Sequence, residues 1–412
     1  MKTDWFSDAR FGLFIHWGIY SIPGKGEWTL FYDDWDFDEY EKLAGQFNPV
    51  DFNPSAWAEL AWNAGMRYVV FTTKHHDGFC MFDSKYTDFK ITNTPYGKDI
   101  AAELVKAFRE KGFKIGFYHS LVDWRHPHFI PDAEHPLWQR GQREFTGRDL
   151  KIYQEYLYNS VEQLLTEYGK IDILFFDYTS KHKNSSEWNP ERLLKMIYRL
   201  QPEILVNDRL SFDKKSYPGD YWTPEISVPN APLSIDGQIK PWETCMTMNN
   251  NWGYNRSDLK FKTPETVITA LLNCISKNGN LLLNVGPDEN GFIPDGSVKI
   301  MRALGEWFKR HEHAVRGAIM SKFTPPQGYF YTQKGDDIFL YLTFPPMGDI
   351  ILPQLADKLL KAERMSDGGV VDIVTHWGFE LLRHDEVRIR PANCVTSDII
   401  KLSIKSNFIT KS

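Results

Sequence analysis

The sequence predicts an α/β fold: a somewhat irregular (β/α)8 barrel of the TIM type, followed by a small antiparallel β domain. About eight short apolar segments with β character are spread over roughly the first 290 residues, and helical patterns alternate with them. Such alternation is typical of a parallel sheet with right-handed crossovers. Nearly every apolar segment also ends in a polar or ionisable side chain. In a parallel barrel the carboxyl ends of the strands meet at one rim, and that rim holds the active site.

The eight predicted strands carry the candidate chemistry. They span residues 11–17, 68–76, 114–120, 171–177, 204–209, 220–225, 242–245 and 281–285. The polar side chains that they place at the rim are His16, His75, His76, Tyr118, His119, Asp177, Asn207, Asp208, Arg209, Glu225, Glu243 and Asn284. Histidines, carboxylates, an arginine and many aromatic rings would meet in one cleft. This combination indicates an enzyme that acts on a polar, ring-shaped substrate.

Six helices are predicted around these strands. Residues 53–65 begin with Asn-Pro and end in glycine, as a capped helix does. Residues 99–112 repeat apolar side chains at helical spacing and also stop at glycine. The other four helices span residues 150–169, 190–200, 263–278 and 294–313. Between Leu210 and Pro241 the pattern weakens to loops rich in Pro, Gly and Ser, so we expect the barrel to be irregular there.

The pattern changes after about Gly317. Short strands are predicted at residues 329–332, 337–342, 349–352, 370–374 and 386–390. We therefore divide the chain into a catalytic barrel at 1–317 and a C-terminal β-sandwich-like domain at 318–412, which is near the low end of ordinary domain sizes. We expect this domain to pack on the barrel as a structural element. A carbohydrate-binding role is the alternative.

Composition excludes several classes of protein. Hydrophobic residues make up 42% and charged residues 25%, as in an ordinary soluble globular protein. The net charge is −6, and no basic cluster suggests a nucleic-acid partner. No apolar run of about 18 residues predicts a membrane helix. The first residues show no signal region, so we expect a cytoplasmic protein, with the reservation that a removed leader would leave no trace.

Cysteine and aromatic usage give two further expectations. Cys80, Cys245, Cys274 and Cys394 form no CxxC pair and have no zinc-finger spacing, so we expect buried, reduced thiols. Aromatic residues reach 15% of the chain. Some of these rings fill the core, and we expect others to line a sugar site, because the apolar faces of sugars stack on aromatic rings.

Six motifs, in order along the chain, resemble the α-L-fucosidases of glycoside hydrolase family 29. They are residues 5–21 (WFSDARFGLFIHWGIYS), 74–79 (KHHDGF), 118–124 (YHSLVDW), 206–209 (VNDR), 252–254 (WGY) and 279–287 (GNLLLNVGP). Family members are retaining hydrolases with a barrel followed by a C-terminal β domain. The resemblance implies an exo-acting retaining α-L-fucosidase that needs no cofactor and acts on a fucosylated oligosaccharide or glycoconjugate. The oligomeric state is left open.

Retaining glycosidases need two carboxyl groups about 5–5.5 Å apart, one as nucleophile and one as acid/base. The resemblance assigns the nucleophile to Asp177, which follows an apolar strand. Family members differ in the position of the acid/base. The Thr-Pro-Glu segment that ends at Glu225 favours this residue, and Glu243 on the seventh strand is the alternative. If Glu225 is the acid/base, Glu243 would hold a sugar hydroxyl or orient a neighbour.

The resemblance also implies a set of substrate-binding residues. Neutral histidines and carboxylates suit the hydroxyl groups of fucose, and aromatic rings suit its C5 methyl group. The residues are His16, Glu27, Trp28, His75, His76, Tyr118, Arg209, Glu243 and Trp252. Phe175 is a further ring suited to the methyl group. Many relatives carry tryptophan beside the aspartate, where this chain has Phe175-Phe176-Asp177, so an aromatic ring is kept. Tyr178 replaces a common glycine and is expected to narrow the leaving-group side, while residues 178–189 and 226–240 are expected to set aglycone choice.

Two alternative functions predict other sequence features. A metal-dependent barrel hydrolase would carry a His-x-His pair at the end of the first strand, and only His16 is there. Neighbouring residues of a strand point to opposite faces, so His75 and His76 are poorly placed to chelate one ion, and we expect no metal site. A non-catalytic fucose-binding protein would lack one of the two carboxylates, and both candidates are present.

Overall fold

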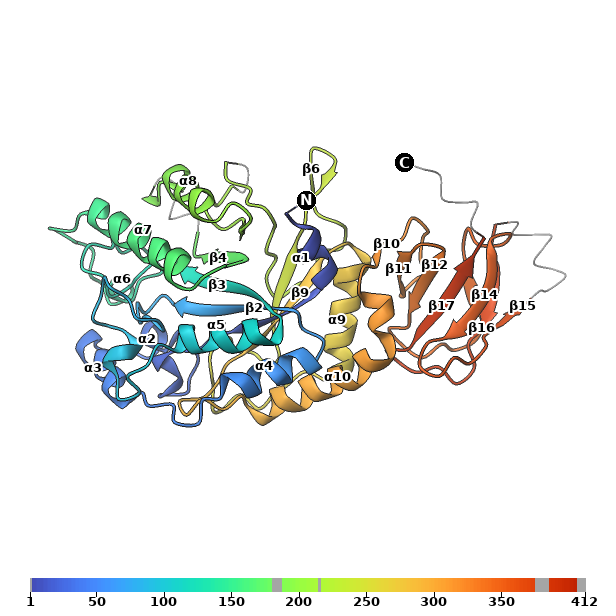
Figure 1. Cartoon of the computed structure of the whole chain (residues 1–412), viewed down its shortest axis with the longest axis horizontal. Helices are drawn as coiled ribbons and strands as arrows, with labels where there is room; N and C mark the ends of the chain where they lie inside the picture. The colour runs from blue at the N-terminus through green and yellow to red at the C-terminus, as the bar shows by residue number, and fades with distance from the viewer. Residues whose placement is uncertain (1, 180–186, 214–215, 375–384, 406–412) are drawn as a thin grey trace.

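A parallel sheet forms the barrel of this computed structural model, which describes residues 2–179, 187–213, 216–374 and 385–405. Seven strands lie in the order β5-β4-β3-β2-β1-β9-β8 (Figure 1). They are β1 (Phe11–Ile15), β2 (Tyr68–Lys74), β3 (Lys114–Ser120), β4 (Ile173–Asp177), β5 (Leu205–Val206), β8 (Glu243–Thr247) and β9 (Asn280–Val285). All of their pairings are parallel. Their side chains are buried almost throughout, as expected for a parallel sheet covered by helices.

The predicted sixth strand is reduced to isolated bridges. Tyr221 pairs with Asn207, Trp222 with Trp242, and Glu225 with Cys245, so this segment connects the two edge strands β5 and β8. The ladder is interrupted because the backbone N–H of Thr223 donates to the side chain of Asp208, at 3.0 Å, and Pro224 has no N–H. The barrel therefore closes through irregular backbone at this position.

The fifth strand is also shorter than predicted. Beyond Val206, the side chain of Asn207 replaces the backbone ladder. Its Nδ2 donates to the carbonyl of Phe176 at 2.8 Å, and its Oδ1 accepts from the N–H of Phe176 at 2.9 Å. This pair of hydrogen bonds fixes the end of β4, one residue before Asp177.

Helices cover the outside of the sheet, and their bounds follow the sequence signals closely. The six predicted helices are α4 (Pro54–Asn63), α5 (Ile100–Lys111), α7 (Leu150–Glu167), α8 (Pro190–Leu200), α9 (Pro264–Ser276) and α10 (Asp295–Val315). Asp99 caps α5 by accepting from Ala102, and Gly112 ends it with φ 101°. No helix occurs between β5 and β8 among the described residues, and only the hairpin β6 (Ser234–Ile235) and β7 (Gln238–Ile239) lies there. The predicted irregularity is confirmed.

Short helices also occur among the described residues of the barrel. They are α1 (Asp4–Ala9), η1 (Ile19–Ser21), α2 (Thr29–Tyr32), α3 (Phe37–Glu41), η2 (Lys42–Gln46), η3 (Ile91–Asn93) and α6 (Pro136–Gln139). Most of them precede or follow the strand ends that carry the motifs. No helix of the described residues is long and apolar enough to cross a membrane. The four cysteines are free and buried, as predicted.

Two antiparallel sheets form the C-terminal region. The first has the order β10-β11-β12-β17-β14 and the second the order β13-β16-β15. The strands are β10 (Ile319–Met320), β11 (Phe330–Lys334), β12 (Asp337–Tyr341), β13 (Ile350–Leu352), β14 (Leu359–Arg364), β15 (Asp372–Val374), β16 (Val387–Arg390) and β17 (Ile399–Ile404). The sequence prediction lacks β10, β14 and β17, although β17 pairs with both β12 and β14. The fold class is confirmed, while the boundary at residue 317 stays a prediction.

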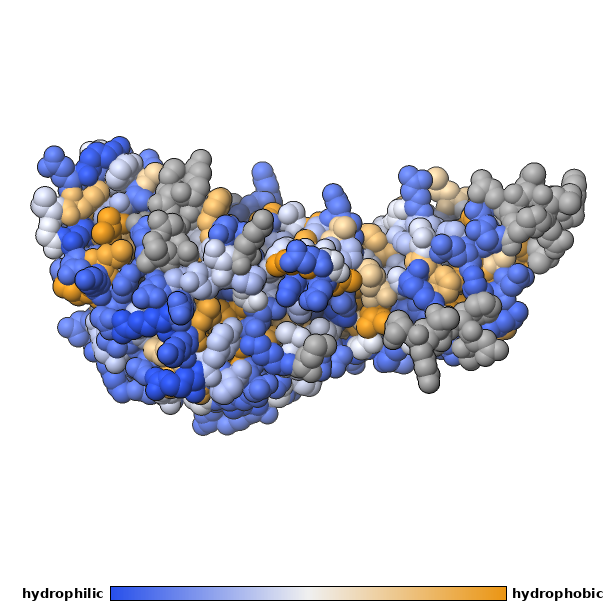
Figure 2. Space-filling view, turned by 90° about the horizontal axis from the view of Figure 1, so that it is seen from above, coloured by the Kyte–Doolittle hydropathy of each residue, from blue (hydrophilic) through white to orange (hydrophobic). Residues whose placement is uncertain are grey.

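The C-terminal sheets pack at the amino end of the barrel strands. Arg10, just before β1, donates to the carbonyl of Ala318 at 2.8 Å. Tyr341 donates to the carbonyl of Ala314 at 2.7 Å, and Trp307 donates to that of Ser397 at 2.8 Å. The molecule is elongated, with the barrel and the C-terminal sheets side by side (Figures 1 and 2), and hydrophilic side chains cover much of the face in Figure 2. The C-terminal sheets therefore do not cover the carboxyl ends of the barrel strands, where the loops lie.

The central position of β17 gives a stability prediction. Leu402 is fully buried in the C-terminal core, so Leu402→Ala should lower the free energy of unfolding by about 2–5 kcal/mol. Leu360→Ala removes the same atoms from a side chain that is 58% exposed and should change it by less than about 1 kcal/mol. Denaturant unfolding of both variants measures the difference. Equal losses in the two variants would contradict the assigned register of β17.

Candidate active site

A cavity of about 460 Å³ opens at the carboxyl ends of the strands. Its volume suits a small polar ligand. It is lined by Phe14, His16, Glu27, Trp28, His75, His76, Tyr118, Phe175, Asp177, Tyr178, Thr179, Arg209, Phe212, Thr223, Pro224, Glu225, Cys245 and Trp252. Ten of the eleven site residues predicted from the sequence are among these. None of the lining comes from the described part of the C-terminal sheets.

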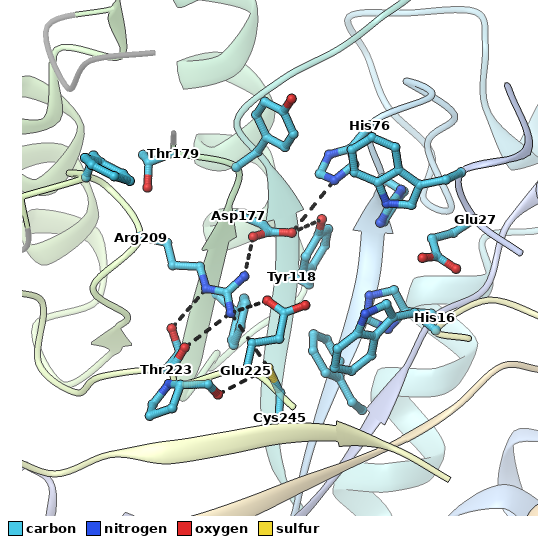
Figure 3. A pocket seen from close by; sticks show the side chains of 18 residues that line it. His16, Glu27, His76, Tyr118, Asp177, Thr179, Arg209, Thr223, Glu225 and Cys245 are labelled. Atoms are coloured by element: carbon cyan, nitrogen blue, oxygen red, sulfur yellow. Dashed lines mark hydrogen bonds and ion pairs between the residues drawn. The ribbon is translucent and has the colours of Figure 1, made fainter. Parts of the chain in front are cut away.

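Arg209 joins the two predicted catalytic carboxylates (Figure 3). Its Nη1 donates to Oδ1 of Asp177 at 2.5 Å, and its Nη2 donates to Oε2 of Glu225 at 2.8 Å. The side chain of Asp177 is 20% exposed and that of Glu225 is 43% exposed. The two carboxylates therefore share one cation, with Asp177 deeper and Glu225 nearer to solvent.

The surroundings of Asp177 keep it ionised. Burial acts to raise its pKa, but the charge of Arg209, the nearby His76 and hydrogen bonds from Arg209 and Tyr118 together lower the pKa below its ordinary value. Tyr118 donates its hydroxyl to Oδ2 of Asp177 at 2.9 Å. Nε2 of His76 lies 3.8 Å from the same oxygen. Asp177 is thus an anion at neutral pH with one face toward the cavity.

Arg209 is itself fixed by residues that sequence reasoning did not identify. Its Nε donates to Oγ1 of Thr223 at 3.1 Å, and the hydroxyl of Thr223 donates to Asp208 at 2.7 Å. The guanidinium carbon lies 5.1 Å from the centre of the Phe175 ring. The only sequence signal for this arrangement is the run of polar residues at 207–209, since Thr223 lies 14 residues further on.

Aromatic rings form two walls of the cavity. Trp252 lies against His16, with ring centroids 5.1 Å apart, and Trp28 lies against His76 at 5.3 Å. Tyr178 lies 4.9 Å from His76 and has φ 81°, a backbone conformation that favours glycine. Phe212 is exposed and was not predicted. Of the loops predicted to set aglycone choice, residues 180–186 lie outside the described residues.

The expected opposition of His75 and His76 is wrong. Strand β2 ends at Lys74, so strand alternation no longer applies to the two histidines, and both line the cavity with ring centroids 4.1 Å apart. Among the described residues, no group of three or more His, Cys, Asp or Glu side chains is arranged to hold a metal ion.

Glu27 is a buried member of the cavity lining. Its Oε2 accepts from the N–H of Gly253 at 2.7 Å. Burial raises its pKa, against the hydrogen bond from Gly253. This hydrogen bond also joins the loop before α2 to the loop after β8, so Glu27 and Trp252 are held in one arrangement.

The prediction that Glu243 lies at the rim is wrong. Glu243 begins β8 and pairs with Asn280, so it is at the amino end of the strand, and it does not line the cavity. Its carboxyl is fully buried and accepts from the hydroxyl of Tyr68 at 2.5 Å. Sequence spacing could not tell the two ends of so short a segment apart. The role of Glu243 as a ligand of the sugar is therefore withdrawn.

The fold and this pocket define a TIM-like barrel protein with a polar site at the carboxyl ends of its strands. A family model described as alpha-L-fucosidase matches residues 1–313. The tissue alpha-L-fucosidase of Macaca fascicularis is 30% identical over 373 residues, which is 84% of this chain and 76% of that protein. The chain belongs to the α-L-fucosidase family.

Solved structures agree with this assignment. Alpha-L-fucosidase isoenzyme 1 from Paenibacillus thiaminolyticus superposes with a TM-score of 0.93 at 39% identity, covering 98% of this chain and 99% of that one. A family 29 alpha-L-fucosidase from Bacteroides thetaiotaomicron, trapped as a covalent intermediate with 2-fluoro-fucosyl fluoride, has a TM-score of 0.83 at 28% identity, covering 97% and 95%. The protein is a glycoside hydrolase.

The new position of Glu243 gives a second prediction. Burial raises its pKa to about 8, against the hydrogen bond from Tyr68 and the charge of Arg209. The protonated carboxyl makes its full contribution to the free energy of unfolding below the ordinary pKa of 4.5. This contribution is lost as the pH rises through about 8. Glu243→Gln cannot ionise, so from pH 6 to 8.5 the variant should gain stability over the parent by up to about 1.4 kcal/mol per pH unit.

Denaturant unfolding at several pH values measures this effect. Glu110→Gln, an exposed change on α5, is the control and should show a constant difference from the parent. Because Glu243 is remote from the cavity, Glu243→Gln should keep kcat/KM within about twofold of the parent near pH 6. A difference in stability that does not vary with pH would show that Glu243 is not protonated in the folded protein.

Proposed function

We propose that this protein is an exo-acting, retaining α-L-fucosidase that releases terminal α-L-fucose by double displacement, with Asp177 as nucleophile and Glu225 as acid/base. The observation that carries the proposal is the bridge from Arg209 to both carboxylates. It holds two carboxyl groups in one pocket, next to the same cation, and a retaining mechanism needs a nucleophile and an acid/base carboxyl that lie close together. The covalent intermediate of the related Bacteroides enzyme supports a double displacement.

The roles follow from the two environments. Asp177 is deep, ionised and flanked by three polar neighbours, Arg209, Tyr118 and His76, as suits a group that attacks the anomeric carbon. Glu225 is the more exposed carboxyl, as suits a group that gives a proton to the leaving oxygen and later takes one from water. Fucosyl transfer to Asp177 breaks the glycosidic bond and releases the protonated aglycone, and hydrolysis of the ester returns both residues to their starting state.

The shape of the cavity supports exo action. Phe14, Tyr118, Phe175 and Cys245 belong to the packed interior of the barrel, and these side chains form the floor. A sugar can therefore enter only from the rim, and one terminal residue is accommodated. The natural substrate that we propose is a fucosylated oligosaccharide or glycoconjugate, with Tyr178 narrowing the leaving-group side. We also propose that the protein is located in the cytoplasm.

Removal of the nucleophile is the direct test. Asp177→Ala should lower kcat on an aryl α-L-fucoside by several orders of magnitude, because the covalent step is lost. Azide should restore part of the turnover and give β-fucosyl azide, since it attacks from the side that the carboxylate occupied. Near-parent activity of Asp177→Ala would overturn the assignment. Full activity in the presence of a strong chelator would dispose of the metal-dependent alternative.

The acid/base is tested by leaving-group dependence. Glu225→Ala should lose far more rate on an oligosaccharide than on a fucoside with an activated phenol, which leaves without protonation. Azide should rescue it by attacking the glycosyl-enzyme and giving α-fucosyl azide. Glu243→Gln, altered at the other end of the barrel, is the matched control and should show neither effect. A uniform loss on both substrates without azide rescue in Glu225→Ala would contradict its role as acid/base.

A further inference from the structure

We propose that Asn284 and Ser120 hold two cavity histidines in opposite tautomers, so that His16 presents an acceptor nitrogen to the substrate and His76 presents a donor. Both are positioning residues: each acts through the histidine that it contacts, and neither lines the cavity. The consequence for the sugar rests on the proposed function, whereas the tautomers themselves rest on the hydrogen-bond geometry alone.

The tautomer of His16 follows from the partners of Asn284. The amide of Asn284 lies between two groups: one of its atoms is 2.7 Å from the carbonyl of Trp252, and the other is 2.7 Å from Nδ1 of His16. A carbonyl can only accept, so the atom that faces Trp252 is the amide nitrogen. The atom that faces His16 is then the amide oxygen, which also can only accept. Nδ1 of His16 must therefore carry the proton.

The tautomer of His76 follows from the partners of Ser120. Oγ of Ser120 accepts from the N–H of Val122 at 3.1 Å and lies 2.7 Å from Nδ1 of His76. The hydroxyl has one proton, and among the described residues no other acceptor is within its reach. The proton is therefore donated to Nδ1 of His76, which must be bare. The N–H of His76 is then at Nε2, which lies 3.8 Å from Oδ2 of Asp177.

Both rings are neutral, so each has a defined tautomer. Burial is the main cause, and it lowers the pKa of His16 to about 4 and that of His76 to about 3. The charge of Arg209 lowers both pKa values further. The hydrogen bond with Asn284 acts to raise the pKa of His16, and the charge of Asp177 acts to raise both pKa values. Neither opposing effect restores an ordinary value. At neutral pH each ring has one donor nitrogen and one acceptor nitrogen, and the neighbour decides which of the two faces the cavity.

Asn284 and Ser120 together give the cavity one side that accepts hydrogen bonds and another side that donates them. With the proton at Nδ1, Nε2 of His16 has a free lone pair. His16 and Glu27 lie on the same side of the cavity (Figure 3), so this side accepts hydrogen bonds. Nε2–H of His76 and the guanidinium of Arg209 donate them on the side of Asp177. A substrate hydroxyl that contacts His16 must therefore donate a hydrogen bond, whereas one that contacts His76 must accept a hydrogen bond. A sugar whose hydroxyl at His16 is blocked would leave a buried acceptor unpaired.

The tautomers are observable directly by NMR. Protein labelled with ¹⁵N in its histidine rings is recorded in long-range ¹H–¹⁵N correlation spectra, which distinguish Nδ1–H from Nε2–H rings. His16→Gln and His76→Gln assign the two signals by their loss. We expect the Nδ1–H form for His16 and the Nε2–H form for His76 in the free enzyme. Either histidine in the opposite tautomer would overturn the proposal, independently of the behaviour of any Ser120 or Asn284 variant.

Variants test the cause of the preference. Ser120→Ala should give mixed tautomers at His76 and lower kcat/KM on an aryl α-L-fucoside by about threefold to tenfold, and Ser120→Thr, which keeps the hydroxyl, should restore both. Asn284→Leu should give mixed tautomers at His16 and leave the tautomer of His76 unchanged. An unchanged His76 signal in folded Ser120→Ala, or an unchanged His16 signal in folded Asn284→Leu, would contradict the role of that residue.

A matched control is available on β2, three residues before His76. Thr73 lies 3.0 Å from Nδ1 of His119, a buried histidine that does not line the cavity. Thr73→Val removes a hydroxyl beside a histidine and should leave both cavity signals and kcat/KM within about twofold of the parent. Absence of fucosidase turnover in the parent would overturn the proposed function but not the tautomers. Full turnover with the opposite tautomers would overturn only this inference.

Discussion

The ion pair between Arg209 and Asp177 is the interaction around which the active end of the barrel is organised. A buried carboxylate in a cavity that is also lined by Phe14, Phe175 and Tyr118 would take up a proton unless a fixed cation stood beside it. Arg209 supplies that cation at 2.5 Å. Its charge is in turn compensated by a second carboxylate, Glu225, so the pocket holds an anion that is ready to react.

Fixing this cation explains the irregular side of the barrel. The regular ladders stop at Val206 and are replaced by side chains: Asn207 binds the backbone of β4, and Asp208 binds Thr223, which orients Arg209. A continuous strand would have pointed alternate residues of this run outward. Three consecutive polar residues can all serve the site only because the backbone leaves the regular sheet there.

The amino ends of the barrel strands serve for packing and for contact with the C-terminal sheets. Glu243 and Tyr68 fill the interior of this end of the barrel, and Arg10 and Trp307 join it to the C-terminal sheets. Ionisation of Glu243 is suppressed by burial alone, whereas ionisation of Asp177 is promoted by a partner. Two carboxyl groups of one barrel thus have opposite protonation states at neutral pH. The separation lets the C-terminal domain stabilise the fold without entering the pocket.

The sequence by itself determined the barrel, most helix bounds, the nucleophile candidate and ten of the lining residues, because buried strands, helix caps and family motifs are local signals. It did not determine which end of a five-residue strand Glu243 occupies, since both ends of a short apolar segment look alike. It also could not show that His75 and His76 point the same way, or that Thr223 and Asn284 orient Arg209 and His16. These facts depend on contacts between residues far apart in the chain, and only the closure of the barrel brings them within hydrogen-bonding distance.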